Sequence, residues 1–170
     1  DTIVVSAAQL DANTEEGALA AELEAAGAHV VAADRRAFEA ASPVRTPSGI
    51  VAIAQRQERT AADVCSGHAA FVLAAIDVQD PGNVGALLRA AEAGGATGAL
   101  VAGSSANPFS WKALRGAMGS TLRLPVAAGL HARDAHAAMA SAGLRTIAGV
   151  ARDGGEDVGL GVRLARNELR

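Results

Sequence analysis

From residue 71 onward, unbroken apolar runs alternate with stretches of helical composition. Apolar runs cover 71–76, 98–102 and 144–150, with a shorter one at 124–126. Strands buried on both faces of a parallel sheet are expected to be continuous apolar runs. Strands that alternate with helices also indicate βαβ units, whose strands run parallel. We therefore predict an α/β fold with a parallel sheet. The helices expected between the strands cover 84–93, 110–119 and 133–142.

The first third of the chain has the same character on a smaller scale. Short apolar runs at 2–5, 29–33 and 49–54 predict strands, and 14–26 predicts a helix with Asn13 or Thr14 as its cap. The stretch around 60–68 is polar. We expect residues 1–57 to form part of a small α/β domain, 58–70 to be a linker, and 71–170 to form the main domain.

Charge and composition exclude several kinds of protein. Half of the 170 residues are hydrophobic, which is enough for a core. The net charge of −3 and an aromatic content of 2% argue against a broadly basic or base-stacking RNA surface, so any RNA site must be a local arginine patch. No apolar run is long enough for a membrane span and no signal peptide is visible, so we expect a cytoplasmic protein.

Cysteine and histidine give no metal site. Cys65 is the single cysteine, so neither a disulfide framework nor a cysteine metal cluster is available, and we expect its thiol to be inert. The four histidines are scattered, and the pair at positions 131 and 136 is five residues apart instead of the four that put two ligands on one helical face. We therefore expect no metal.

The segment after the strand at 71–76 is the strongest candidate for chemistry, because ligands of α/β sheets bind at the carboxyl ends of strands. Pro81 and Gly82 predict a tight turn, Asn83 a helix cap, and Gly85 a close approach of a backbone or a ligand. Arg89 lies in an otherwise apolar helix, which indicates a covered surface or a bound anion. Each residue also has a plain structural explanation: Asn83 as a cap only, Gly85 as a packing glycine, and Arg89 as a solvated side chain.

Taken together, these residues resemble a known family. The run D-P-G-N-V-G-A-L-L-R-A-A (80–91) is similar to the first motif of SpoU (TrmH-like) methyltransferases, D-P-x-N-x-G-x-x-x-R-x-A. Residues 105–126, which end in R-L-P-V, resemble the next block of that family. Upstream, residues 38–54 resemble the end of the small RNA-binding domain that often precedes the catalytic domain.

The resemblance implies a trefoil-knotted α/β catalytic domain of the SPOUT class that acts as a homodimer. Such an enzyme transfers a methyl group from S-adenosylmethionine to a ribose 2′-hydroxyl of RNA, here 23S rRNA in preference to tRNA. Arg89 and Asn83 would be the catalytic residues. An arginine, with a pKa above about 12, is a poor base, so we expect Arg89 to bind the target phosphate and stabilise the developing oxyanion. The other implied contacts are Arg45, Arg115 and Arg123 for RNA and Gly149, Val150 and Ala151 for the cofactor.

The chain departs from the family pattern in one place. The third motif is absent, as if tens of residues were missing between Val158 and Gly159, and the chain begins midway through the expected N-terminal domain. Either the sequence comprises ordered residues only, with disordered segments closed up, or the polypeptide lacks the knot and is inactive. We favour the first explanation. A non-catalytic RNA-binding relative and a nucleotide-binding enzyme of another class stay open as alternatives.

Overall fold

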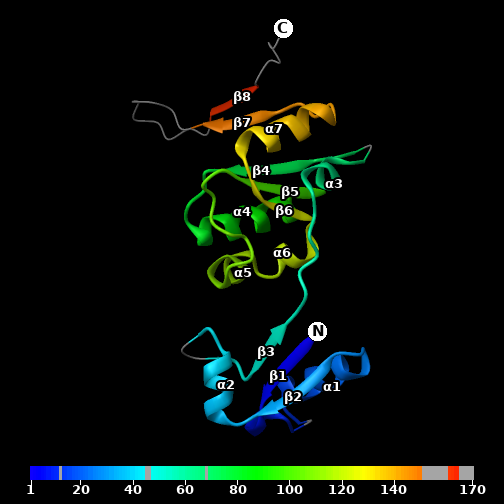
Figure 1. The fold of residues 1–170 in the computed structure, drawn as a ribbon, viewed down its shortest axis with the longest axis vertical. Helices are drawn as coiled ribbons and strands as arrows, with labels where there is room; N and C mark the ends of the chain where they lie inside the picture. The colour runs from blue at the N-terminus through cyan, green and yellow to red at the C-terminus, as the bar shows by residue number, and fades with distance from the viewer. Residues whose placement is uncertain (12, 45–46, 68, 151–160, 165–170) are drawn as a thin grey trace. The chain divides into compact units, whose positions relative to one another are not determined.

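The chain folds into two compact units, residues Asp1–Gln57 and Glu58–Arg170 (Figure 1). The computed structural model describes residues 1–11, 13–44, 47–67, 69–150 and 161–164. The boundary between the units coincides with the end of the predicted first domain.

The first unit is a three-stranded sheet with two helices. Its central strand pairs in parallel with the second strand and antiparallel with the third, in the order β2-β1-β3. Ile3 and Val5 of the central strand and Ala20 of the first helix form its core. The three predicted strands and the predicted helix at 14–26 are confirmed, each within one residue at either end. The elements are β1 (Thr2–Ser6), the 3-10 helix η1 (Ala7–Gln9), α1 (Glu15–Ala25), β2 (His29–Ala33), α2 (Arg35–Ala41) and β3 (Ile50–Ile53).

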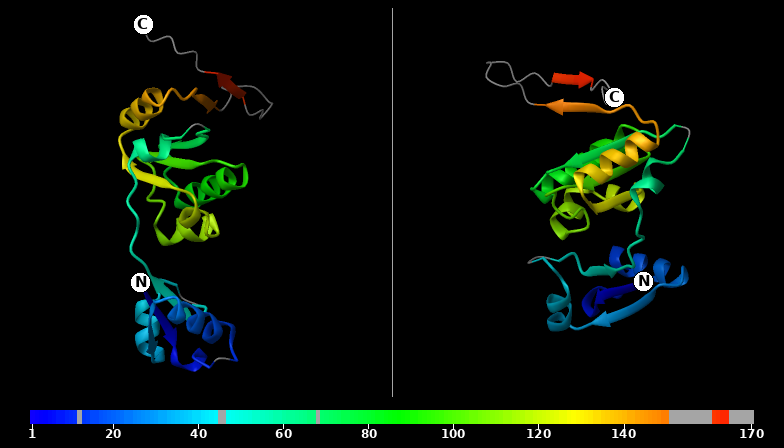
Figure 2. Two further views of the ribbon diagram at one scale, coloured as in Figure 1. Left: turned by 90° about the vertical axis from the view of Figure 1, so that its right-hand side faces the viewer. Right: turned by 45° about the horizontal axis from the view of Figure 1, so that its top comes forward.

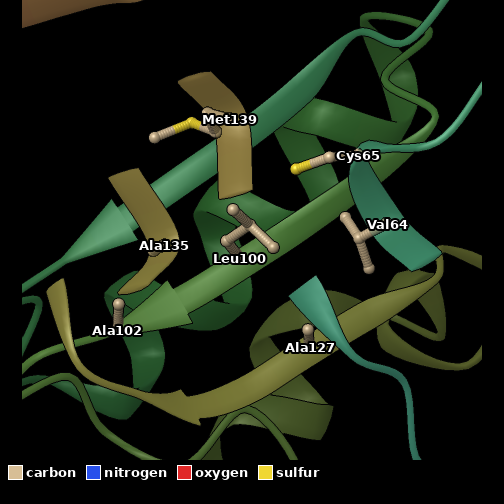
Figure 3. Packing of buried hydrophobic residues seen from close by; sticks show 7 residues of the cluster. All are labelled: Val64, Cys65, Leu100, Ala102, Ala127, Ala135 and Met139. Atoms are coloured by element: carbon tan, nitrogen blue, oxygen red, sulfur yellow. The ribbon is translucent and has the colours of Figure 1, made fainter. Parts of the chain in front are cut away.

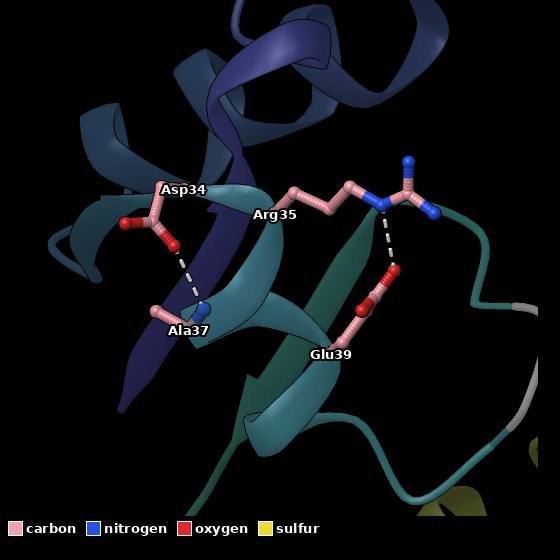
Figure 4. Close-up of polar contacts among 4 residues, drawn as sticks. All are labelled: Asp34, Arg35, Ala37 and Glu39. Carbon is pink, nitrogen blue, oxygen red and sulfur yellow. Dashed lines mark hydrogen bonds and ion pairs between the residues drawn. The ribbon is translucent and has the colours of Figure 1, made fainter.

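Helix α2 was not predicted, and its cause is local. The carboxylate of Asp34 accepts a hydrogen bond from the backbone N–H of Ala37 at 2.8 Å and so caps the helix (Figure 4). Arg35 and Glu39 form an i,i+4 ion pair at 2.9 Å on its exposed side. Phe38 is buried and anchors the helix. Thr14, one of the two predicted caps of α1, does cap that helix through Gly17.

The second unit contains the predicted parallel sheet, in the order β4-β5-β6. A separate antiparallel pair, β7–β8, follows it, so the predicted strand at 144–150 is shorter than expected and pairs outside the parallel sheet. The elements are α3 (Ala61–Cys65), β4 (Val72–Ile76), α4 (Pro81–Ala93), β5 (Gly98–Ala102), α5 (Trp111–Ala117), α6 (Ser120–Arg123), β6 (Val126–Leu130), α7 (Ala132–Ser141), β7 (Ile147–Val150) and β8 (Gly161–Leu164).

Helices cover both faces of the parallel sheet, and its middle strand β5 is buried along its whole length (Figures 1 and 2). Leu100 and Ala102 face α3 and α7, while Ala99 and Val101 face α4, because side chains alternate along a strand. Figure 3 shows the first of these two layers, where the middle strand packs against Val64, Cys65 and Met139. Full burial explains why this strand is an unbroken apolar run in the sequence.

Helix α3 lies where we predicted a linker over 58–70. Thr60 and Asp63 form a capping box: the Thr60 hydroxyl accepts from the N–H of Asp63 at 3.1 Å, and the Asp63 carboxylate accepts from the N–H of Thr60 at 2.9 Å. Val64 and Cys65 then enter the core. The segment is polar because it is a short, mostly exposed helix, and its two buried residues are too few to produce a visible pattern.

Candidate active site at the start of helix α4

Helix α4 begins directly after the loop that leaves β4, and Asp80 is its cap. The Asp80 carboxylate Oδ1 accepts a hydrogen bond from the backbone N–H of Asn83 at 3.0 Å. Pro81 is the first helical residue, a position where its fixed φ and missing N–H are favourable. The predicted tight turn at Pro81–Gly82 and the predicted cap at Asn83 were therefore wrong: the helix starts one turn earlier.

Asp77 joins the loops that follow β4 and β5. Its backbone is left-handed, with φ of 57°, and its Oδ1 accepts from the N–H of Ser104 at 2.7 Å. A Cβ at Gly103, which has φ of 65°, would lie 2.3 Å from that same carboxylate oxygen. Ser105 adds a second link, since its hydroxyl accepts from the N–H of Val78 at 2.9 Å. The carboxyl edge of the sheet is thus fixed by a specific set of hydrogen bonds.

Helix α4 packs on α5 with backbone against backbone. A Cβ at Gly85 would lie 2.3 Å from the carbonyl oxygen of Ala113 and 2.8 Å from the backbone nitrogen of Ala117. A Cβ at Gly116 would lie 3.1 Å from the carbonyl oxygen of Gly82. Gly85 therefore serves the close approach that we predicted, and what approaches is a helix backbone.

An ion pair lies beside this contact. Lys112 Nζ of α5 is 2.6 Å from Asp80 Oδ2. Two hydrogen bonds hold the pKa of the Asp80 carboxyl below its ordinary value. The larger effect comes from Lys112 and the smaller from the backbone N–H of Asn83. Sequence reasoning missed Lys112, although one signal was present: it is the only lysine among 15 lysine and arginine residues.

Asn83 and Arg89 both lie on α4 and are both exposed. Six residues of helix separate them by about 9 Å along the axis and turn them about 120° apart. Within the part of the chain that the structure describes, neither side chain makes a hydrogen bond or an ion pair. Both side chains are therefore accessible, Asn83 in the first turn of the helix beside the carboxyl edge of the sheet and Arg89 further along the helix.

The predicted RNA-binding arginines differ from one another. Arg115 is exposed on α5, and no described residue pairs with its side chain. Arg123 instead binds Glu92 of α4, with Nε 2.6 Å from Oε1 and Nη2 2.9 Å from Oε2. The Arg123 guanidinium lowers the pKa of Glu92 from 4.5 to about 2. Arg45 lies outside the described residues.

The predicted cofactor contacts are described in part. Gly149 and Val150 lie in β7, opposite Val162 and Gly161 of β8. Ala151 lies outside the described residues, as does the point between Val158 and Gly159 where we placed the missing motif. Among the described residues, no three potential metal ligands gather into a site. None of the described helices has the length and apolarity needed to cross a bilayer.

Known proteins match the second unit. The sequence model of the SpoU rRNA Methylase family matches residues 70–159, which is more than half of the chain. The chain belongs to the SpoU family. The match begins beside β4, contains Asn83, Arg89, Arg115 and Arg123, and ends next to the predicted gap.

A curated SpoU relative is the 23S rRNA (guanosine(2553)-2′-O)-methyltransferase RlmP of Bacillus subtilis (strain 168). It is 37% identical over 90 residues, which is 53% of this chain and 34% of RlmP. The chain therefore spans about a third of the length of this relative, and about half that of the solved structures described next.

Solved structures agree with the fold. The AdoMet-bound rRNA methyltransferase of Sinorhizobium meliloti is 26% identical, with a TM-score of 0.66 over 84% of this chain and 51% of its own. The SpoU methyltransferase AviRb of Streptomyces viridochromogenes is 18% identical, with a TM-score of 0.67 over 83% of this chain and 50% of its own, which supports the fold alone. The predicted SpoU-type α/β fold with its parallel sheet is confirmed.

Proposed function

We propose that this chain is part of an S-adenosylmethionine-dependent RNA 2′-O-methyltransferase, with 23S rRNA as its substrate. The observation that carries the proposal is the pair Asn83 and Arg89, exposed and without described partners on the first helix within the SpoU match. The name of RlmP supports the choice of 23S rRNA and of the ribose 2′-hydroxyl. Methyl transfer to tRNA is the alternative substrate.

For methyl transfer, the protein has to stabilise charge and to position the reacting groups. Bound S-adenosylmethionine supplies a methyl group on a positively charged sulfur. Arg89 binds the phosphate next to the target ribose and stabilises the negative charge that develops on the 2′-oxygen as its proton leaves for solvent. The Asn83 amide holds that hydroxyl by a hydrogen bond, so that its lone pair is directed at the methyl group. Gly149 and Val150 are candidates for cofactor contact, because a glycine lets a ligand approach the backbone closely.

The RNA must also be bound at points distant from the reacting ribose. We assign this binding to Arg115, which is exposed on α5, and to Arg45 in the first unit. We propose that the first unit is part of an RNA-binding domain. Arg123 would take part only by leaving Glu92. We further propose that the protein acts as a homodimer in the cytoplasm without a metal, in keeping with an RNA substrate and a single, unpaired cysteine.

The decisive experiment is methyl transfer from labelled S-adenosylmethionine to 23S rRNA by the full-length protein and by an Arg89→Ala variant. The variant is expected to lose roughly a hundredfold or more in kcat, the usual effect of removing one donor that stabilises an oxyanion. Arg133→Ala, which removes an exposed arginine of α7, is the control and should methylate normally. Normal methylation by Arg89→Ala would remove the role assigned to Arg89.

A non-catalytic RNA-binding relative is the second candidate, because the third family motif is absent from the sequence. Calorimetry with S-adenosylmethionine separates the two: no binding to the full-length protein would exclude the enzyme. Trp111, the only tryptophan in a chain without tyrosine, lies half-exposed at the start of α5 and is the fluorescence probe for an RNA titration. A titration that responds to tRNA and not to 23S rRNA fragments would overturn the choice of substrate.

A further inference from the structure

The chain contains one lysine, Lys112. The other 14 of its 15 lysine and arginine residues are arginines. The two side chains differ in geometry. A guanidinium offers a planar fork that binds both oxygens of a carboxylate, while an ammonium is a compact charge that binds one. We therefore expect Lys112 to make a contact that the planar guanidinium of an arginine would disturb.

The Asp80 carboxylate provides such a contact, because its two oxygens have different tasks. Oδ1 accepts from the backbone N–H of Asn83 at 3.0 Å, and Oδ2 binds Lys112 Nζ at 2.6 Å. One carboxylate thus connects the first turn of α4, which carries Asn83, to α5. An arginine at position 112 would compete for the oxygen that caps the helix.

The lysine stem also lies over the same helical turn. A Cβ at Gly82 would lie 2.8 Å from Asp80 Oδ1 and 3.5 Å from Lys112 Cε, so any side chain at position 82 would meet the carboxylate and the stem of this pair. The side chains of Asp80 and Lys112 are 46% and 65% exposed, and ion pairs this exposed contribute little to stability. An effect of this pair is therefore expected in the position of the first turn of α4, more than in the free energy of unfolding.

We propose that Asp80 and Lys112 are positioning residues for methyl transfer: together they fix the first turn of α4 and thereby the Asn83 side chain. This inference rests on the proposed function, since it assigns Asn83 to the reacting ribose. It places no contact between Lys112 and the RNA. A small displacement of a catalytic group lowers kcat steeply, while substrate affinity is held by other contacts.

The test compares Lys112→Met and Lys112→Arg with the full-length wild-type protein in steady-state methylation of 23S rRNA. Lys112→Met is expected to lower kcat roughly tenfold with KM for RNA unchanged. Lys112→Arg keeps the charge and should recover only part of kcat. Asp134→Asn, which removes one charge of an exposed ion pair on α7, is the matched control and should leave both constants unchanged.

Two results would overturn the proposal. Wild-type kcat in Lys112→Met would show that the pair does not position the site. A raised KM with unchanged kcat would show that Lys112 binds RNA directly. Recovery of kcat by Lys112→Arg supports the proposal, and full recovery would show that the charge beside Asp80 suffices without the lysine geometry.

Hydrogen exchange gives a readout that does not depend on activity. The N–H of Asn83 donates to Asp80, so its exchange should be faster in Lys112→Met and unchanged in Asp134→Asn. Unchanged exchange at Asn83 in Lys112→Met would also overturn the proposal. If the wild-type protein methylates no RNA, the proposed function fails while this measurement still decides whether Lys112 orders the turn.

Discussion

The two faces of the parallel sheet are closed in different ways, although the same middle strand supplies both. On the α3 and α7 face, Leu100 meets side chains of ordinary core size, including Val64 and Met139. On the α4 face, Val101 meets Val84 and Leu88, and α4 is in turn packed on α5. Contact between α4 and α5 depends on glycines at which a Cβ would strike a backbone atom.

The residues that matter for stability and the residues proposed for catalysis therefore lie on different faces of the sheet. The α3 and α7 face is held by side-chain volume, and its exposed charges, such as the Arg133–Asp134 pair of α7, lie outside the matched motif of residues 80–91. On the other face, backbone contact at Gly85 and Gly116 brings two helices close together, and Asn83, Arg89 and Arg115 remain exposed. Residues proposed for catalysis therefore belong to the face that is packed by glycine.

Leu100→Ala is expected to have the largest effect on stability, because it leaves a cavity in the side-chain layer of the α3 and α7 face. Leu100 is fully buried, and truncation of a buried leucine costs about 2–5 kcal/mol in the free energy of unfolding. Denaturant unfolding of the variant measures the loss. Leu122→Ala, at a side chain that is 77% exposed, is the control and should stay within about 0.5 kcal/mol of wild type. Equal stability of the two variants would contradict this description of the face.

Gly85→Ala tests the opposite kind of packing, where adding one methyl group should do harm. The new Cβ would meet the Ala113 carbonyl oxygen, and overpacking of this kind costs about 1–3 kcal/mol. Gly94→Ala is the control at the end of the same helix, since its Cβ would come no nearer than 3.3 Å to a neighbouring atom. Thermal unfolding of both variants checks the contrast. A Gly85→Ala protein as stable as Gly94→Ala would mean that the helices do not touch as described.

Arg123→Ala tests the rim of the α4 face, with a small effect that depends on pH. The pKa of Glu92 is lowered from 4.5 to about 2, so the favourable contribution of its ionised form is present above pH 4.5 and is lost as the pH falls toward 2. In the variant, the Glu92 pKa should rise toward 4.5 and this acid-sensitive contribution should be reduced, because Arg123 is the largest cause of the shift and Ser120 the second. An NMR titration of the Glu92 side chain measures the pKa. A value still near 2 without Arg123 would show that another group causes the shift.

The sequence was most informative where burial is complete. Strand β5 is enclosed on both faces, so nothing but apolar residues fits its five positions, and its boundaries at 98–102 were predicted as they occur. Short helices were missed. Helices α2 and α3 bury one and two residues respectively, which leaves no period to detect.

The candidate site was predicted in part. Asn83 and Arg89 follow from the motif, but the cap was assigned to Asn83 because its side chain suits that position, although Asp80 does too and precedes a proline. The pairing of Asp80 with Lys112 and of Glu92 with Arg123 spans about thirty residues in each case. Such pairs depend on how helices pack on one another, which no local pattern encodes.

The burial of Cys65 has a practical consequence. Cys65, the last residue of α3, is 3% exposed, burial raises the pKa of its thiol, and it is the only cysteine in the sequence. A thiol reagent therefore reacts with Cys65 only when the layer around it opens, locally or by global unfolding. The labelling rate measures this opening without any engineered probe.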